Sequence, residues 1–92
     1  MIIVAGYLRV TSTNRDTVLA HAHEAIRLAR GTPGCQDFAL SPDPIDPERV
    51  NVYERWTDRT VLNAFRGRAP ENQLDPLIGS VHVAEFEAHP MK

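Results

Sequence analysis

The stretch from residue 34 to residue 56 constrains the fold more than any other part of the chain. It contains two segments that are predicted to be strands, Cys35–Ser41 and Val50–Trp56. The loop between them, with the sequence PDPIDPE, carries three prolines that stiffen it and exclude a helix. Two strands joined by a rigid connection are therefore expected in the middle of the chain.

The segment before this pair predicts a strand followed by a helix. Residues 2–10 are apolar and β-branched, which favours a strand. After the turn residues 11–14, Thr13 and Asp16 have the spacing of a helix cap. The helix is expected to end at Gly31 and Pro33. Its apolar stripe consists of Val18, Leu19, Ala22, Ala25, Ile26 and Ala29.

The segment after the pair predicts a shorter helix and a last strand. Thr57 or Asp58 can cap this helix, which is expected to end near Gly67. Residues 68–80 have no clear pattern, although Pro70 and Pro76 bracket a possible helical turn, and residues 81–88 alternate like a strand. The order β-α-β-β-α-β predicts a ferredoxin-like α+β fold with a four-stranded antiparallel sheet.

Two helices can cover only one face of such a sheet. Tyr7, Asn51 and Tyr53 are expected on the second face, and they are amphipathic rather than freely solvated types. A second copy of the chain is the simplest cover, so we expect a homodimer.

Length and composition restrict the class of protein. With 92 residues the chain is expected to form a single domain, residues 1–92, and a net charge of −2 with scattered basic residues argues against nucleic acid as a partner. A membrane partner is not expected, because no apolar run is long enough to span a bilayer and the N-terminus lacks the features of a signal peptide. The single Cys35 excludes an internal disulfide and fits the cytoplasm.

Glu54 is the most unusual residue of the second central strand. Val50, Val52, Glu54 and Trp56 alternate along it and share one face, so a carboxylate lies among apolar side chains. One interpretation is structural: Glu54 pairs with an arginine across the sheet or a dimer interface, and Trp56 is core. The other is a carboxylate with a raised pKa in a small apolar pocket, where it orients or deprotonates an aromatic substrate.

The four histidines do not predict a metal site. His21 and His23 are two residues apart on a helix and point in different directions, so both are expected to be solvated. His82 shares a face with Ala84 and Phe86 and is expected to be at least half buried, either as a hydrogen-bonded core histidine or as a catalytic one. Cys35 is expected to be a small buried thiol.

The pattern of residues 34–66 resembles the antibiotic biosynthesis monooxygenase family. The matching residues are Gly34, Cys35, Phe38, Leu40, Asp43, Val52, Tyr53, Glu54, Arg55, Trp56 and Asp58. The resemblance implies a ferredoxin-like fold that pairs into a dimeric α+β barrel. It also implies oxidation of anthrones, quinols or related phenols by dioxygen without a metal, flavin or haem.

Two departures from related proteins shape the expected chemistry. Many relatives carry a histidine on the second helix where this chain has Phe65. The haem-degrading branch uses an asparagine, a tryptophan and a histidine, at places that correspond to Gly6, Phe65 and about Asp75. Haem degradation is therefore not expected.

Three functions remain open. The first is a cofactor-independent monooxygenase for a small aromatic, quinol or anthrone-like compound, the second a non-catalytic ligand-binding or stress-response module, and the third an isomerase or decarboxylase. For the first, we expect Glu54 and His82 to be catalytic. The residues expected to bind the substrate are Trp56, Phe38, Phe65, Tyr53 and Asn51.

Overall fold

The computed structural model describes residues 1–68 and 76–91, and it has the predicted β-α-β-β-α-β order. The elements are β1 (Ile2–Val10), α1 (Arg15–Arg30), β2 (Cys35–Pro42), β3 (Arg49–Trp56), α2 (Arg59–Arg68) and β4 (Ile78–Glu87). The ferredoxin-like fold class is confirmed. The possible helical turn after Pro70 falls mostly on residues 69–75, outside the described residues.

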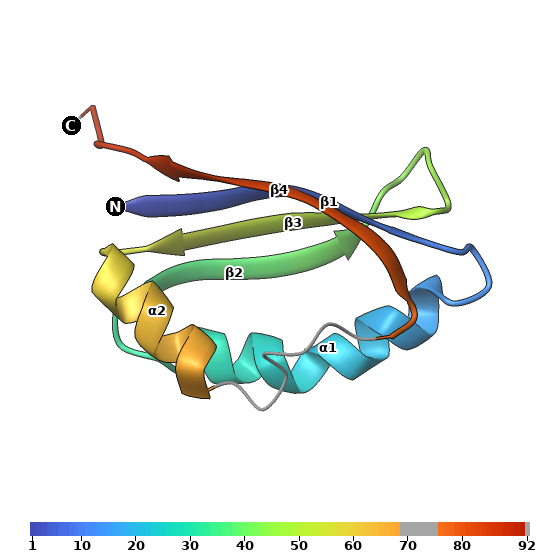
Figure 1. Cartoon of the computed structure of the whole chain (residues 1–92), viewed down its shortest axis with the longest axis horizontal. Coiled ribbons are helices and arrows are strands. Elements are labelled where there is room, and N and C mark those ends of the chain that lie inside the picture. The colour runs from blue at the N-terminus through green and yellow to red at the C-terminus, as the bar shows by residue number, and fades with distance from the viewer. Residues whose placement is uncertain (69–75, 92) are drawn as a thin grey trace.

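The four strands form one antiparallel sheet in the order β2-β3-β1-β4. β1 and β3 occupy the centre, and β2 and β4 form the two edges. Both helices lie against the same face of the sheet (Figure 1). The other face, called here the second face, therefore has no covering layer from the described part of the chain.

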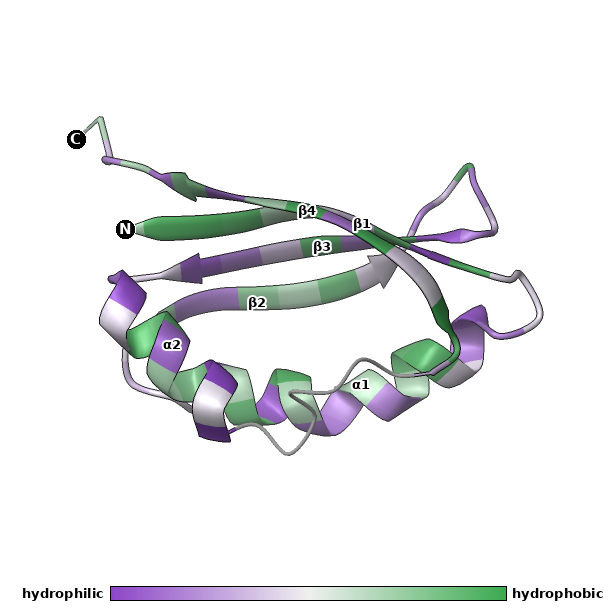
Figure 2. Ribbon diagram, viewed as in Figure 1, coloured by the Kyte–Doolittle hydropathy of each residue, from purple (hydrophilic) through white to green (hydrophobic). Residues whose placement is uncertain are grey.

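The core lies between the helices and the sheet. Along β1 and β3 the residues on the helix-covered face are buried, as the period-two pattern predicts, except Gly6 and Glu54, which are half-buried. One cluster of buried residues surrounds Trp56 and Leu62, and a second surrounds Val18 and Val50. Figure 2 shows hydrophobic and hydrophilic residues alternating around α1, as expected for a helix that buries one stripe.

The helix ends agree with the sequence in part. Gly31 is the C-cap of α1, and the Asp58 carboxylate accepts a hydrogen bond from the Val61 backbone N–H at 2.9 Å at the start of α2. The cap predicted at Thr13 and Asp16 is wrong, because the N-cap of α1 is Asn14 and its side chain makes no capping hydrogen bond. The Thr13 hydroxyl instead lies 3.3 Å from that of Thr11.

The proline-rich loop between β2 and β3 is held by an ionic network. The Asp43 carboxylate accepts hydrogen bonds from the backbone N–H groups of Ile45 and Asp46 and from the Asn51 amide. These hydrogen bonds lower the pKa of Asp43 to about 2, and the one from Asn51 has the largest effect. Arg9 pairs with Asp46 at 2.5 Å and ties the loop to β1.

β1 and β4 approach each other closely at Gly6. The φ angle of Gly6 is +152°, and a Cβ atom there would lie 2.7 Å from the Val83 Cα and would clash with the His82 carbonyl. Glycine is therefore required at this point of the central strand. β4 also begins at Ile78, three residues before the predicted start at Val81.

Candidate functional site

Glu54 lies on the face of the sheet that the helices cover. It pairs in register with Val4 of β1 and with Phe38 of β2, and it is half-buried. The indole N–H of Trp56 donates a hydrogen bond of 3.0 Å to its Oε1. The two residues are two apart on β3, so the shared face predicted from the sequence brings them into direct contact.

The pKa of the Glu54 carboxyl is raised. Removal from water is the largest cause, because burial penalises the charged form. The Trp56 hydrogen bond and the positive charge of Arg66 oppose this effect, and the charge of Glu85 adds to it. A carboxylate with a raised pKa is a stronger base than a solvated one, which suits it to proton transfer.

Three aromatic rings pack beside this carboxylate. The Trp56 ring centroid lies 5.1 Å from that of Phe65 and 6.3 Å from that of Phe38, and the Phe38 and Phe65 centroids are 5.9 Å apart. Trp56 has 0% of its surface exposed, while Phe38 and Phe65 have 8% and 6%. The three rings therefore form one packed aromatic cluster, and Trp56 joins it to Glu54.

The other proposed site residues lie on the second face. The His82 ring stacks on Tyr7 with centroids 4.8 Å apart, and its Nε2 lies 2.8 Å from the Ser80 hydroxyl. The Arg49 guanidinium lies over the Tyr7 ring, 4.1 Å from its centroid. His82 is exposed, so the expectation that it is at least half buried is wrong for the single chain. The reason is that β4 is an edge strand and the second face has no cover.

Tyr53 and Asn51 accompany His82 on this face. The Tyr53 hydroxyl accepts a hydrogen bond from Arg55, and the Asn51 amide bonds the loop residue Asp43. The structure thus gathers Glu54, Trp56 and the two phenylalanines on one side of the sheet and His82, Tyr53 and Asn51 on the other. Within one chain these two groups cannot contact the same small substrate.

An ion-paired cluster beside Glu54 was not predicted from the sequence. The Glu85 carboxylate of β4 pairs with Arg59 at 2.7 Å and with Arg66 at 2.8 Å, and both arginines belong to α2. These pairs fasten α2 to β4 and place positive charge near Glu54. A glutamate and two arginines that are 19 to 26 positions apart in the sequence carry no local pattern that would reveal the contact.

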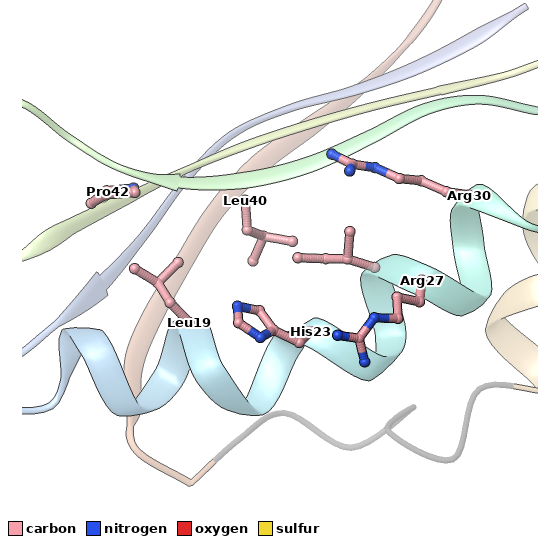
Figure 3. A pocket seen from close by; sticks show the side chains of 7 residues that line it. Leu19, His23, Arg27, Arg30, Leu40 and Pro42 are labelled. Atoms are coloured by element: carbon pink, nitrogen blue, oxygen red, sulfur yellow. The ribbon is translucent and has the colours of Figure 1, made fainter.

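A hollow of about 430 Å³ lies between α1 and β2 (Figure 3). It belongs to neither group of predicted site residues. Its lining consists of Leu19, His23, Ile26, Arg27, Arg30, Leu40 and Pro42. His23, expected from the sequence to be a solvated helix residue, is exposed and forms part of this lining.

Two further features are absent from the described residues. In residues 1–68 and 76–91, no three histidine, cysteine, aspartate or glutamate side chains lie together as metal ligands would. No helix in the same residues has the length and apolar character needed to cross a membrane.

The fold and the half-buried Glu54 carboxylate define a ferredoxin-like α+β protein with an acidic group on its helix-covered face. Residues 1–70 match the family described as antibiotic biosynthesis monooxygenase, and the chain belongs to that family. The resemblance seen in residues 34–66 is thereby confirmed. Family membership supports a general role of the monooxygenase type.

Solved structures show the same fold. A Nitrosomonas europaea protein described as an antibiotic biosynthesis monooxygenase superposes with a TM-score of 0.84 at 15% identity, covering 96% of this chain and 98% of that one. A conserved protein of Bacteroides thetaiotaomicron gives 0.85 at 22% identity, covering 95% and 96%. Another structure described as an antibiotic biosynthesis monooxygenase gives 0.80 at 25% identity, covering 98% and 100%. No curated protein sequence matches this chain.

Proposed function

We propose that the protein is a cofactor-independent monooxygenase that oxidises a small aromatic, quinol or anthrone-like compound with dioxygen. The observation that carries this proposal is the half-buried Glu54 carboxylate, which has a raised pKa and is oriented by the Trp56 indole. Family membership supports the reaction type.

The proposed chemistry needs only a base, an apolar environment and dioxygen. Glu54 removes a proton from the substrate, and the resulting electron-rich anion reduces dioxygen and forms a carbon–oxygen bond. For an anthrone, the methylene carbon loses two hydrogens and gains one oxygen atom, while the second oxygen atom leaves as water. Phe38, Phe65 and Trp56 hold the carboxylate in surroundings that exclude water and raise its basicity.

Oxygen uptake with a panel of anthrones and quinols tests this function. In Glu54→Gln the amide oxygen can still accept the Trp56 hydrogen bond, so the variant is expected to fold. Its turnover should fall by about 10²–10⁴, the usual contribution of a general base. Glu24→Gln makes the same change at an exposed position of α1 and should stay within about twofold of the parent. A folded Glu54→Gln with full activity would refute the role of Glu54 as base.

A ligand-binding module without oxygenase activity is the second candidate. The observation in its favour is that the hollow of about 430 Å³ is not lined by Glu54. The presence of Phe65 in place of the histidine of many relatives also favours this candidate. Tight binding of an aromatic compound without oxygen consumption would support this candidate. Conversion of the substrate under anaerobic conditions would instead indicate isomerase or decarboxylase chemistry.

The functional unit proposed here is a cytoplasmic homodimer joined through the second face, as in a dimeric α+β barrel. This face carries Tyr7, Tyr53 and Ala84, and Phe86 is 53% exposed on it. Burial of such residues against a second copy would remove apolar surface from water.

Sedimentation velocity tests the dimer. Phe86→Asp should shift the protein toward monomer, because a carboxylate would then have to be buried at the interface. Ile45→Asp is the matched control, since Ile45 is 88% exposed in the loop between β2 and β3. A parent protein that sediments as a monomer at every concentration would rule out the dimer.

A further inference from the structure

We propose that the hollow between α1 and β2 binds a small amphipathic organic anion, a carboxylate with an apolar body. The volume of about 430 Å³ falls in the range of small-molecule sites, roughly 300–1,000 Å³. The hollow combines an apolar floor with three basic side chains, and none of the seven residues that line it is acidic. These two properties together define the ligand class.

The floor is formed by side chains that also belong to the outer layer of the core. Leu40 packs against both core clusters, Ile26 against one and Leu19 against the other. Pro42, at the end of β2, completes the apolar lining. Because the core fixes these side chains, the floor is formed before any ligand arrives, which lowers the entropic cost of binding.

The three basic side chains, His23, Arg27 and Arg30, all come from α1 (Figure 3). Arg30 reaches across to the edge strand, where its Nε donates a hydrogen bond of 2.9 Å to the Phe38 carbonyl, and this bond orients its guanidinium. His23 and Arg27 are one helical turn apart and so lie on the same side of α1. The Arg27 side chain is 75% exposed, and its ion pair with Glu24, at 3.7 Å, is loose. A ligand carboxylate can therefore compete with Glu24 for Arg27.

The combination selects against other occupants. Inorganic phosphate would satisfy the arginines but leave the floor in water, whereas a neutral aromatic would cover the floor and leave the charges unmatched. The site does not include Glu54, so it is independent of the proposed oxygenase chemistry. It would serve a monooxygenase or a binding module equally well.

Titrations followed by amide chemical shifts in ¹⁵N-labelled protein test the proposal. The probe is 2-naphthoate, with 2-naphthamide as its neutral counterpart and acetate and phosphate as anions without an apolar body. We expect saturable shifts for 2-naphthoate at the amides of His23, Arg27 and Leu40. Binding of the other three should be at least about fivefold weaker, the size of one surface charge interaction combined with loss of the apolar contact.

A matched pair of variants tests the charge. Arg27→Gln should weaken the binding of 2-naphthoate about fivefold. Arg68→Gln removes the same charge at an exposed position of α2 outside the hollow, and it should change the affinity less than about twofold. Higher salt should weaken the binding of 2-naphthoate and leave the binding of 2-naphthamide unchanged. Equal affinity for the naphthoate and the amide, equal effects of the two variants, or shifts centred away from α1 and β2 would each overturn the proposal.

Discussion

The hydrogen bond between Trp56 and Glu54 predicts a large loss of stability in Trp56→Phe. The change removes the only described donor to the half-buried Glu54 carboxylate, and a hydrogen bond to a charged group contributes about 1.5–3 kcal/mol. It also removes part of a fully buried ring system. A residual cavity of roughly 40 Å³ adds about 1 kcal/mol, so the free energy of unfolding should fall by about 2.5–4 kcal/mol.

Urea unfolding followed by circular dichroism measures this loss at fixed protein concentration, since dimer formation would make stability depend on concentration. A fall of about 3 kcal/mol corresponds to about 12–24 °C in the melting temperature of a domain this small. Phe65→Leu is the control, because it trims the same aromatic cluster without breaking a hydrogen bond, and it should cost about 1–1.5 kcal/mol. If the two variants lose the same stability, the indole–carboxylate bond contributes nothing and the reasoning is wrong.

Three further predictions concern pH and backbone geometry. The raised pKa of Glu54 means that the folded state holds its proton more tightly than the unfolded state, so the parent should lose stability as pH rises from the ordinary glutamate range through the raised value. The urea midpoint of Glu54→Gln should not show this decline. If the variant has the same pH profile as the parent, the prediction is wrong. The pKa of Asp43 is lowered to about 2, so this carboxylate stabilises the folded state above the ordinary aspartate range, and the stabilisation is lost as pH falls toward 2. Asp43→Asn should therefore lower the urea midpoint more at pH 7 than at about pH 2.5. Gly6→Ala should destabilise by more than about 2 kcal/mol because its Cβ meets the β4 backbone. Gly67→Ala, whose added methyl would meet no atom of the described residues beyond its own helix turn, should be neutral or stabilising in thermal melts.

Local patterns in the sequence were sufficient for the element order. The β1 bounds were predicted to the residue, because a run of β-branched residues has few alternatives. The prediction of the α1 cap was wrong because Asn14, Thr13 and Asp16 are all capping types, and the choice among them depends on where the chain leaves β1. The early start of β4 at Ile78 depends on pairing with β1, which is not a local property.

The candidate site was predictable to the extent that it depends on strand alternation. The shared face of Glu54 and Trp56 follows from their spacing, and the hydrogen bond between them confirms it. The position of His82 relative to Glu54 depends on which face of an edge strand meets the helices, and that is decided by register across β1. The hollow at α1 and β2 depends on how far a helix stands from an edge strand, which no residue spacing encodes.

The close approach at Gly6 restricts which residues the central strand can carry at this position. The sequence resemblance implies that the asparagine of the haem-degrading branch corresponds to Gly6, and a Cβ atom at Gly6 would collide with the backbone of β4. The exchange therefore cannot succeed as a single substitution. β4 would first have to move, so the pairing of β1 with β4 is the structural barrier to an asparagine at this position.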